Sequence, residues 1–281
     1  MTITAGGGTP LRDVLVALDA LWPLAGAQEW DAPGLVVGNP DSEIRSIHLV
    51  IDATIDSVAE AMDQGADLII AHHPLLLRGV TTVSEATYKG HLIAQLIRGG
   101  CALYAAHTNA DSVPTGTSWR LAELLGLLTH TPLTEGSIPG HGLGRVGSLP
   151  VAKTLYEVAV AVGEILPQTA VGPVVAGDAN QVITTVSLCA GAGDSFLTHP
   201  AVLASDVYIT SDLRHHPASE AREQARLGGG PALITISHFA AEWLWLEGAS
   251  AELEHALGLP ITVSDLNTDP WTFQVNRVGG E

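Results

Sequence analysis

Residues 67–74, DLIIAHHP, and residues 102–111, ALYAAHTNAD, decide the fold of this chain. In each stretch a short apolar run ends in polar side chains, as a buried strand of a parallel sheet does. A further apolar run covers 47–51, and Ala-rich stretches with helical periodicity lie near 55–64 and 91–98. This alternation predicts βαβ units and therefore an α/β fold with mixed, mainly parallel sheets.

A weak internal repeat extends the pattern to the second half of the chain. The segment DLIIAHH at Asp67 is echoed by DVYITSD at Asp206, and GGCALYAAHTNAD is echoed by GGPALITISHFAAE. In each copy a second strand ends in a His that is followed four residues later by a carboxylate, His107 with Asp111 and His238 with Glu242. The repeat predicts two duplicated α/β lobes, each with polar groups at the carboxyl ends of its strands, where open α/β sheets place their sites.

Composition excludes several classes of protein. Of 281 residues, 46% are hydrophobic and 15% charged, which argues against disorder. The formal net charge of −18 would repel a phosphate backbone, so we expect no nucleic-acid partner. Cys101 and Cys189 lie in apolar runs without CxxC spacing, which favours buried thiols in a reducing compartment.

The apolar runs of the sequence are too short to cross a bilayer, for which roughly 18 or more residues are needed. The N-terminal stretch 11–22 carries Asp13 and Asp19 and has helical periodicity, so it predicts an amphipathic helix with Thr9 as N-cap and Pro10 as its first residue. We therefore expect a cytoplasmic protein that makes no membrane contact.

Two histidines at a strand exit are the first candidate metal ligands. His72 and His73 follow a predicted strand and precede Pro74, which cannot continue a sheet. At a bent strand end both imidazoles can converge on neighbouring points, which fits a pair of metal ions better than one. The alternative is that they are two polar residues of a loop.

A His–carboxylate pair is the second candidate. His238 and Glu242 are four residues apart and follow Ser237, a plausible N-cap, so on a helix they project from one face. Asp111 lies just past another strand, in a loop rich in Gly and Pro. Each could be a surface group, but together they supply the imidazoles and carboxylates that bind divalent transition metals.

The segment TSDLRHHPAS contains a rival cluster, Asp212, His215 and His216. It could be a second metal site, or it could face the same cleft as substrate-binding groups. We favour the second role, because further carboxylates that would complete a ligand set are not found nearby. Asp212, His216 and His107 are therefore the candidate substrate contacts.

Taken in order, these motifs resemble the GTP cyclohydrolase 1 type 2 homologue family, also called the Nif-three-like family. The resemblance runs from WDAPGLVVG at Trp30 through AHHPLLLRG, AAHTNAD, GRVGSLP, CAGAGDSF and YITSDLRHH to SHFAAE at Ser237, and covers nearly the whole chain. It implies a two-metal site held by His72, His73, Asp111, His238 and Glu242. This chain has Ala32 where the family usually has Asn, and Ser211 within the usual TGD motif, which bears on substrate contacts more than on metal binding.

The resemblance and the ligand set together predict a function. We expect a dinuclear-metal-dependent hydrolase that acts on a nucleotide-like or phosphorylated small molecule, with two divalent cations per chain chosen from Zn, Fe, Mn, Ni and Co. Ring opening of GTP is a further option within the enzyme class. The alternative from another class is a non-catalytic metal-binding protein that regulates or handles metal.

The expected domain division follows from the ligand set, because Glu242 must meet His73. We expect a first lobe of residues 1–129 and 231–281, which carries the metal site, and a second lobe of residues 130–230, with a junction near the Gly- and Pro-rich segment 128–150. The resemblance also implies a homo-oligomer, in the form of a toroidal hexamer.

Overall fold

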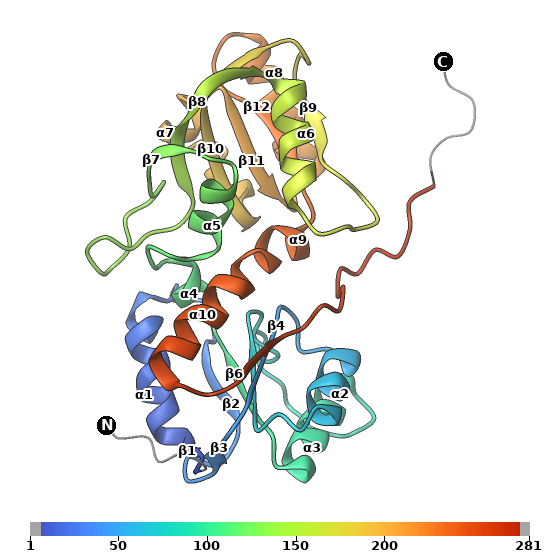
Figure 1. The fold of residues 1–281 in the computed structure, drawn as a ribbon. Helices are drawn as coiled ribbons and strands as arrows, with labels where there is room; N and C mark the ends of the chain where they lie inside the picture. Colours follow the sequence, from blue (N-terminus) through green and yellow to red (C-terminus); the bar gives the residue numbers. More distant parts are fainter. Residues whose placement is uncertain (1–6, 276–281) are drawn as a thin grey trace. The chain divides into compact units, whose positions relative to one another are not determined.

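A computed structural model describes residues 7–275, and its chain divides into two compact units. Unit 1 contains the chain up to Gly116, Gly136–His141 and Trp245–Thr268. Unit 2 contains Thr117–Glu135, Gly142–Leu244 and the chain from Asp269 onward. Both units combine helices with a mixed sheet, so the predicted α/β class is confirmed (Figure 1).

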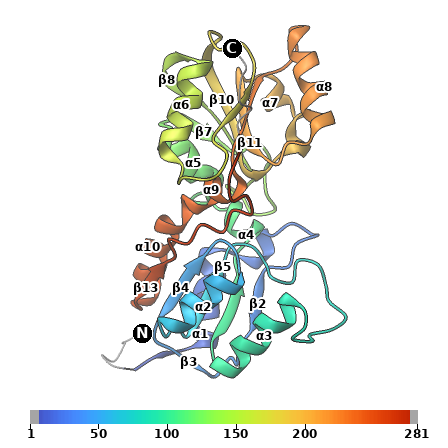
Figure 2. The ribbon, with the colours of Figure 1, turned by 90° about the vertical axis from the view of Figure 1, so that its right-hand side faces the viewer.

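Unit 1 is a five-stranded sheet with helices on both faces. The strands are β2 (Gly34–Val37), β4 (Ile47–Val50), β5 (Leu68–Ala71), β6 (Ala102–Ala105) and β13 (Ile261–Val263), in the order β13-β4-β5-β6-β2. All neighbours are parallel except β2, which is antiparallel to β6. The helices are α1 (Leu11–Leu21), α2 (Ile55–Asp63), α3 (Tyr88–Gly99), α4 (Thr108–Asp111) and α10 (Trp245–Leu257). Helices α1 and α10 contact each other over one face, and α2 and α3 contact each other over the other (Figure 2).

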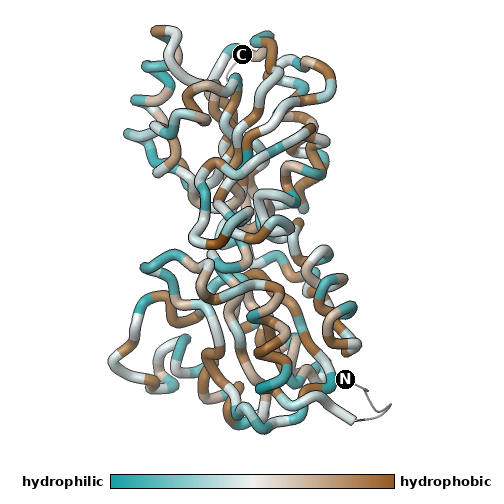
Figure 3. The backbone as a smooth tube through the Cα atoms, turned by 90° about the vertical axis from the view of Figure 1, so that its left-hand side faces the viewer, coloured by the Kyte–Doolittle hydropathy of each residue, from teal (hydrophilic) through white to brown (hydrophobic). Residues whose placement is uncertain are grey.

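The strands and helices predicted in unit 1 are present almost at the expected bounds, because their apolar residues are the core. Ile69, Leu103 and Val50 on the sheet pack against α2 and α3. On the opposite face Trp22 and Trp245 are fully buried with ring centroids 5.1 Å apart. The hydrophobic residues coloured brown in Figure 3 follow these central strands.

The start of α1 differs from the prediction. Thr9 and Pro10 form the short strand β1 (Thr9–Pro10), which pairs with β3 (Glu43–Ile44), so the N-cap is Pro10 and not Thr9. No side chain caps this helix; the N–H groups of Leu11 and Arg12 donate instead to carbonyls of Ser42 and Pro40. The neighbouring loop thus satisfies the N–H groups that a Thr cap would have satisfied.

Unit 2 repeats the arrangement with a six-stranded sheet. Its strands are β7 (Leu128–Thr131), β8 (Arg145–Thr154), β9 (Val174–Ala176), β10 (Val182–Ala192), β11 (Val207–Ser211) and β12 (Ala232–Thr235), in the order β7-β8-β10-β11-β12-β9. Its helices are α5 (Thr117–Leu124), α6 (Leu155–Ile165), α7 (Pro200–Leu203), α8 (His215–Arg226) and α9 (His238–Trp243). One hydrophobic cluster joins the sheet to α5, α6 and α9, and another joins it to α7 and α8.

The division between the units differs from the expected 1–129 plus 231–281. Strand β12 pairs with β11 inside the second sheet, so residues 232–244 belong to unit 2 and the chain enters unit 1 only at Trp245. Residues 145–150, expected within the junction, form the first part of strand β8 (Arg145–Thr154). His238 and Glu242 therefore lie in unit 2, whereas His72, His73 and Asp111 lie in unit 1.

The two sheets share the order predicted by the repeat. Parallel strands β4-β5-β6 with antiparallel β2 at the edge correspond to β10-β11-β12 with antiparallel β9. The Ala106 N–H donates to the Ala71 carbonyl, as the Ile236 N–H donates to that of Thr210. By this register His107 corresponds to Ser237, so the two histidines aligned by sequence are one position apart.

No helix in the described part of the chain is both long enough and apolar enough to cross a membrane.

Candidate metal centre

Three imidazoles of unit 1 meet at the carboxyl ends of neighbouring parallel strands. His72 and His73 follow β5, and their N–H groups continue the ladder by donating to the carbonyls of Val50 and Ile51. His107 follows β6 and is the N-cap residue of α4. Since the strand ends are fixed by these hydrogen bonds, the backbone places all three rings at one edge of the sheet, as the sequence predicted for the first two.

The three rings form a cluster. Their centroids are 5.2 Å (His72 to His73), 5.4 Å (His72 to His107) and 5.6 Å (His73 to His107) apart. One ring nitrogen from each lies within 4.8 Å of the other two. His72 is fully buried and His107 is 9% exposed, whereas the side chain of His73 is 26% exposed. The cluster is thus buried on one side and reachable from solvent on the other.

Each imidazole of this cluster is oriented through Nδ1. The Nδ1 atom of His72 lies 2.7 Å from the carbonyl oxygen of Ala106, that of His73 2.7 Å from Asp52 Oδ1, and that of His107 2.7 Å from Asp31 Oδ1. A carbonyl or ionised carboxylate can only accept, so Nδ1 carries the proton and Nε2 keeps its lone pair. Metal-binding histidines are held in this way by a carboxylate or carbonyl on the second nitrogen.

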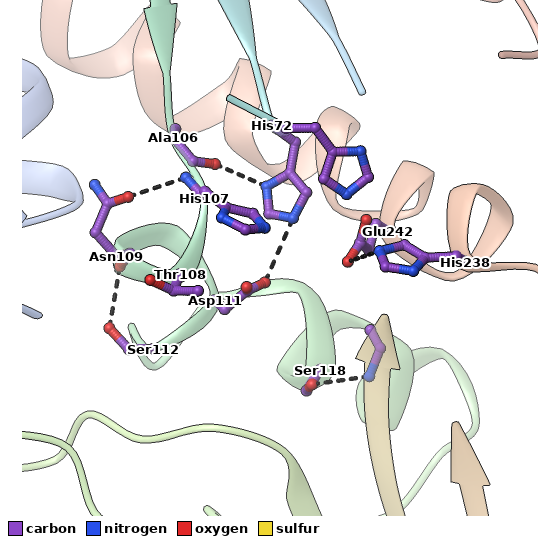
Figure 4. Close-up of polar contacts among 12 residues, drawn as sticks. His72, Ala106, His107, Thr108, Asn109, Asp111, Ser112, Ser118, His238 and Glu242 are labelled. Atoms are coloured by element: carbon purple, nitrogen blue, oxygen red, sulfur yellow. Dashed lines mark hydrogen bonds and ion pairs between the residues drawn. The ribbon is translucent and has the colours of Figure 1, made fainter. Parts of the chain in front are cut away.

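Asp111 adds a carboxylate to the cluster. It lies at the end of α4 and not in the irregular loop that its sequence suggested, and its N–H donates to the His107 carbonyl. Its Oδ1 lies 3.6 Å from Nε2 of His72 (Figure 4). Imidazole nitrogens beside a carboxylate oxygen are the donors that divalent transition metals take in proteins, so the residues of unit 1 fit such an ion.

The pKa of Asp31, a carboxylate at this edge of the sheet, is strongly lowered. Burial opposes its ionisation, but hydrogen bonds from His107 and Thr108, with the charge of His107, outweigh burial and hold the pKa of Asp31 at about 2. Its side chain is fully buried, and it also accepts the N–H of Thr108. Asp31 therefore stays ionised at neutral pH and fixes both the ring of His107 and the start of α4.

Unit 2 carries the second His–carboxylate set. His238 begins α9 after Ser237, whose side chain accepts the N–H of Ala240, so the predicted N-cap is confirmed. Nε2 of His238 lies 3.0 Å from Oε1 of Glu242 one helical turn later (Figure 4). Glu242 is 3% exposed. Gly191 makes room for this carboxylate, because a Cβ there would lie 2.4 Å from Oε1 of Glu242.

Asp212 orients His238 in the same manner as Asp52 orients His73. It follows β11 with a left-handed φ of 56°, and its Oδ2 lies 2.7 Å from Nδ1 of His238. Burial opposes protonation of His238, but the charges of Glu242 and Asp212 outweigh burial and raise the pKa of the imidazole well above its ordinary value. The carboxylates on either side of this ring therefore favour positive charge at the position it occupies.

Two of the predicted substrate contacts have different surroundings from those expected. His107, expected beside the substrate, belongs to the imidazole cluster. His216 is exposed in the first turn of α8 and contacts the ring of His215. Asp212 does line a pocket of unit 2, but His216 does not.

Sequence reasoning assigned no role to Asp31 or Asp52. Asp52 stands just beyond the predicted strand 47–51, the same position relative to a strand that identified His72. The position of Asp52 at the end of the neighbouring predicted strand was therefore enough to indicate that it belongs to the site. Asp31 lies in the WDAPG segment far from any predicted strand end, so its contact with His107 needed the fold.

Comparisons with known proteins agree with this architecture. Residues 9–270 match the family described as Duf34/NIF3 (NGG1p interacting factor 3). A protein of Streptomyces coelicolor named GTP cyclohydrolase 1 type 2 homolog is 44% identical over 94% of each chain. The solved structure of Staphylococcus aureus protein SA1388 matches 95% of this chain and 100% of its own with a TM-score of 0.85 and 25% identity. A Bacillus cereus protein related to NIF3 shares the fold, with a TM-score of 0.84 and 21% identity over 97% of this chain and 100% of its own. The chain therefore belongs to the Duf34/NIF3 family.

Proposed function

We propose that this protein is a dinuclear-metal-dependent hydrolase that acts on a nucleotide-like or phosphorylated small molecule. The observation that carries the proposal is the cluster of His72, His73 and His107, in which every Nδ1 faces an acceptor and every Nε2 keeps its lone pair. A His cluster that only served packing would not need three separate acceptors to fix its tautomer. The names of the relatives support hydrolysis of a nucleotide ring as one candidate reaction.

The proposed ligands come from both units. Unit 1 supplies His72, His73 and Asp111, and we add His107 because its ring belongs to the same cluster. Unit 2 supplies His238 and Glu242, which the family resemblance assigns to the same centre. Nitrogen and carboxylate donors in this number suit two ions of Zn, Fe, Mn, Ni or Co, which differ little in the ligands they accept.

The residues of the proposed metal centre have different chemical roles. When bound, two divalent ions supply Lewis acidity and lower the pKa of water. Asp31, Asp52 and Asp212 accept hydrogen bonds from the Nδ1 atoms of His107, His73 and His238, so each ring keeps one orientation. Asp111 and Glu242 supply negative charge, which offsets that of the cations. Bound cations would also attract a phosphorylated substrate to a chain of net charge −18.

Metal analysis of matched histidine variants tests this proposal. His107→Ala should lose metal, because it removes one of the clustered donors, whereas His216→Ala should keep it, because His216 is an exposed residue of α8. Elemental analysis of protein purified without chelator should give about two divalent ions per wild-type chain. Equal metal content in the two variants would contradict the ligand assignment.

A turnover screen over nucleotides and phosphoesters then separates the enzyme from its alternative. Wild-type protein should hydrolyse at least one member of the screen, and chelation should abolish that activity. Full metal occupancy without any turnover would instead favour the non-catalytic metal-binding protein.

We also propose, on the family resemblance, that the chain forms a ring-like homo-oligomer, with a hexamer as the expected size. Light scattering coupled to gel filtration measures the mass directly. A monomeric mass near 29.2 kDa would contradict this proposal.

A further inference from the structure

A pocket of unit 2 opens beside His238. It encloses about 250 Å3 at the carboxyl ends of β11 and β12, and its wall includes His238 and Asp212. Pockets for drug-sized ligands enclose roughly 300–1,000 Å3, so this one suits a group of one or two rings. Glu242 does not line this pocket, whereas Asp269 and Trp271 do, so the proposed metal ligands do not account for this space.

The charged side chains that line this pocket are mainly carboxylates. Asp212 and Asp269 contribute carboxylates, and the described residues of its wall include no Lys or Arg. A carboxylate offers about four acceptor positions and no donor when ionised. The only charged group of the described wall that favours a positive charge is His238, which Asp212 and Glu242 already flank. The two carboxylates of the wall therefore fit a ligand that donates N–H groups and carries no negative charge.

The remaining walls of the pocket are apolar and partly aromatic. Phe239 and Val174 line it, and Trp271 closes one side. The indole of Trp271 is 69% exposed, which leaves a large aromatic face unburied by the chain's own side chains. Flat heterocycles gain stacking energy on such a face, whereas a flexible aliphatic group does not.

Trp271 is tied to the helix that begins with His238. Oδ1 of Asp269 accepts the backbone N–H of Trp271 at 2.9 Å, and its Oδ2 accepts the hydroxyl of Ser237, the N-cap of α9. The aromatic wall and the His238 side of the pocket are thus joined through one carboxylate. The backbone of Trp271 is thus fixed beside the pocket while its side chain stays exposed.

We propose that this pocket binds the planar heterocyclic end of the substrate, through stacking on Trp271 and N–H donation to the carboxylates of Asp212 and Asp269. The inference deepens the proposed function and rests on it for the identity of the ligand as substrate. In this arrangement the pocket of unit 2 binds the uncharged ring of the substrate. The charged, reacting end of the substrate lies outside the pocket, at the proposed metal ligands.

Calorimetric titration with nucleosides tests the pocket without any reaction. Guanosine presents adjacent N–H and NH2 donors and no phosphate, whereas inosine lacks the NH2 group and is its matched control. Guanosine should bind several-fold more tightly than inosine to protein both before and after chelation. Equal affinities, or no heat with either nucleoside, would overturn the proposal.

Variants of the aromatic wall supply the second arm. Trp271→Ala should weaken guanosine binding roughly tenfold or more, and Trp271→Phe should recover most of the affinity. Phe273→Ala is the control, because Phe273 is also exposed and near in sequence but does not line the pocket. Loss of affinity in Phe273→Ala equal to that in Trp271→Ala would overturn the assignment.

Competition with inorganic phosphate, together with binding measured after chelation, tests the pocket separately from the proposed hydrolase function. Added to chelated protein, phosphate should leave the guanosine affinity unchanged, and competition would mean that the pocket is an anion site. The protein could bind guanosine although it holds no metal and hydrolyses no compound of the screen. That result would support the pocket proposal and contradict the hydrolase proposal. Guanosine binding that disappears on chelation would overturn the pocket as an independent site.

Discussion

The Oδ1 atom of Asp52 lies 2.7 Å from Nδ1 of His73, while the other oxygen of the same carboxylate accepts the hydroxyl of Thr268 at 2.6 Å. One carboxylate thus orients an imidazole and fastens a C-terminal segment of unit 1. The contact with Thr268 can be removed without the contact with His73, which makes the contribution of His73 orientation measurable by difference.

Asp52→Ala should weaken metal binding roughly 10- to 100-fold, because the ring of His73 loses the acceptor that fixes its tautomer. The measurement is competition with a chelator of known affinity. Thr268→Val is the matched control, since it removes the other contact of Asp52 and leaves His73 oriented. If Thr268→Val lowers metal affinity as much as Asp52→Ala does, the attachment of the segment around Thr268, and not the orientation of the His73 ring, determines metal affinity.

Asp31 should make stability depend on pH in the acid range. Its pKa is about 2 in the folded chain against an ordinary 3.8, so folding favours the ionised form. The resulting stabilisation of roughly 2 kcal/mol is complete above about pH 5 and is lost progressively as the pH falls from about 5 to about 1. Urea unfolding of metal-free protein should show Asp31→Asn less stable than wild type at pH 6, with a smaller gap at pH 3.

An exposed acid provides the control for this pH effect. Asp41 is paired with Arg12 at the surface, where its side chain is 68% exposed. Asp41→Asn should change stability at pH 6 by less than about 1 kcal/mol, because an exposed ion pair contributes little. A gap between wild type and Asp31→Asn that stays constant from pH 6 to pH 3 would contradict the assignment of the effect to ionisation.

Gly191→Ala should disturb the His238–Glu242 pair. Gly191 has a φ of 80°, and its added Cβ would lie 2.4 Å from Oε1 of Glu242 and 3.3 Å from Nε2 of His238. Gly228→Ala isolates the backbone strain, because Gly228 has a φ of 86° with nothing within 4 Å of the added atom. Each variant should lose about 1 kcal/mol to strain, and only Gly191→Ala should also lose metal. Normal metal content in Gly191→Ala would argue that Glu242 is not a ligand.

Removal of metal should lower the melting temperature of the wild-type protein by several degrees, since the ions bind the folded chain and not the unfolded one. Scanning calorimetry before and after chelation, with metal loss confirmed by elemental analysis, measures the effect. His107→Ala, which should already lack metal, is the control and should show no further decrease. A melting temperature that does not respond to confirmed metal loss would contradict a ligand set that ties distant segments together.

Sequence pattern predicted the strands around His72 and His107 because their residues are apolar throughout and end abruptly in polar groups. It could also pair His238 with Glu242, since a four-residue spacing on a helix is local information. The unit to which these two residues belong depends on the pairing of β12 with β11, which is a long-range contact that periodicity does not encode. The same limit applies to Asp31, which reaches His107 across 76 positions of sequence.

Helix α10 places Trp245 against His72, with ring centroids 5.4 Å apart, yet every member of the imidazole cluster and both of its carboxylate partners precede residue 112. During synthesis the N-terminal part of a chain leaves the ribosome first. The histidines of unit 1 are therefore exposed to the ions of their surroundings before the segment that covers His72 has been translated. The order of the residues along the chain therefore places every donor of the imidazole cluster in the part that is synthesised before the side chain that packs against His72.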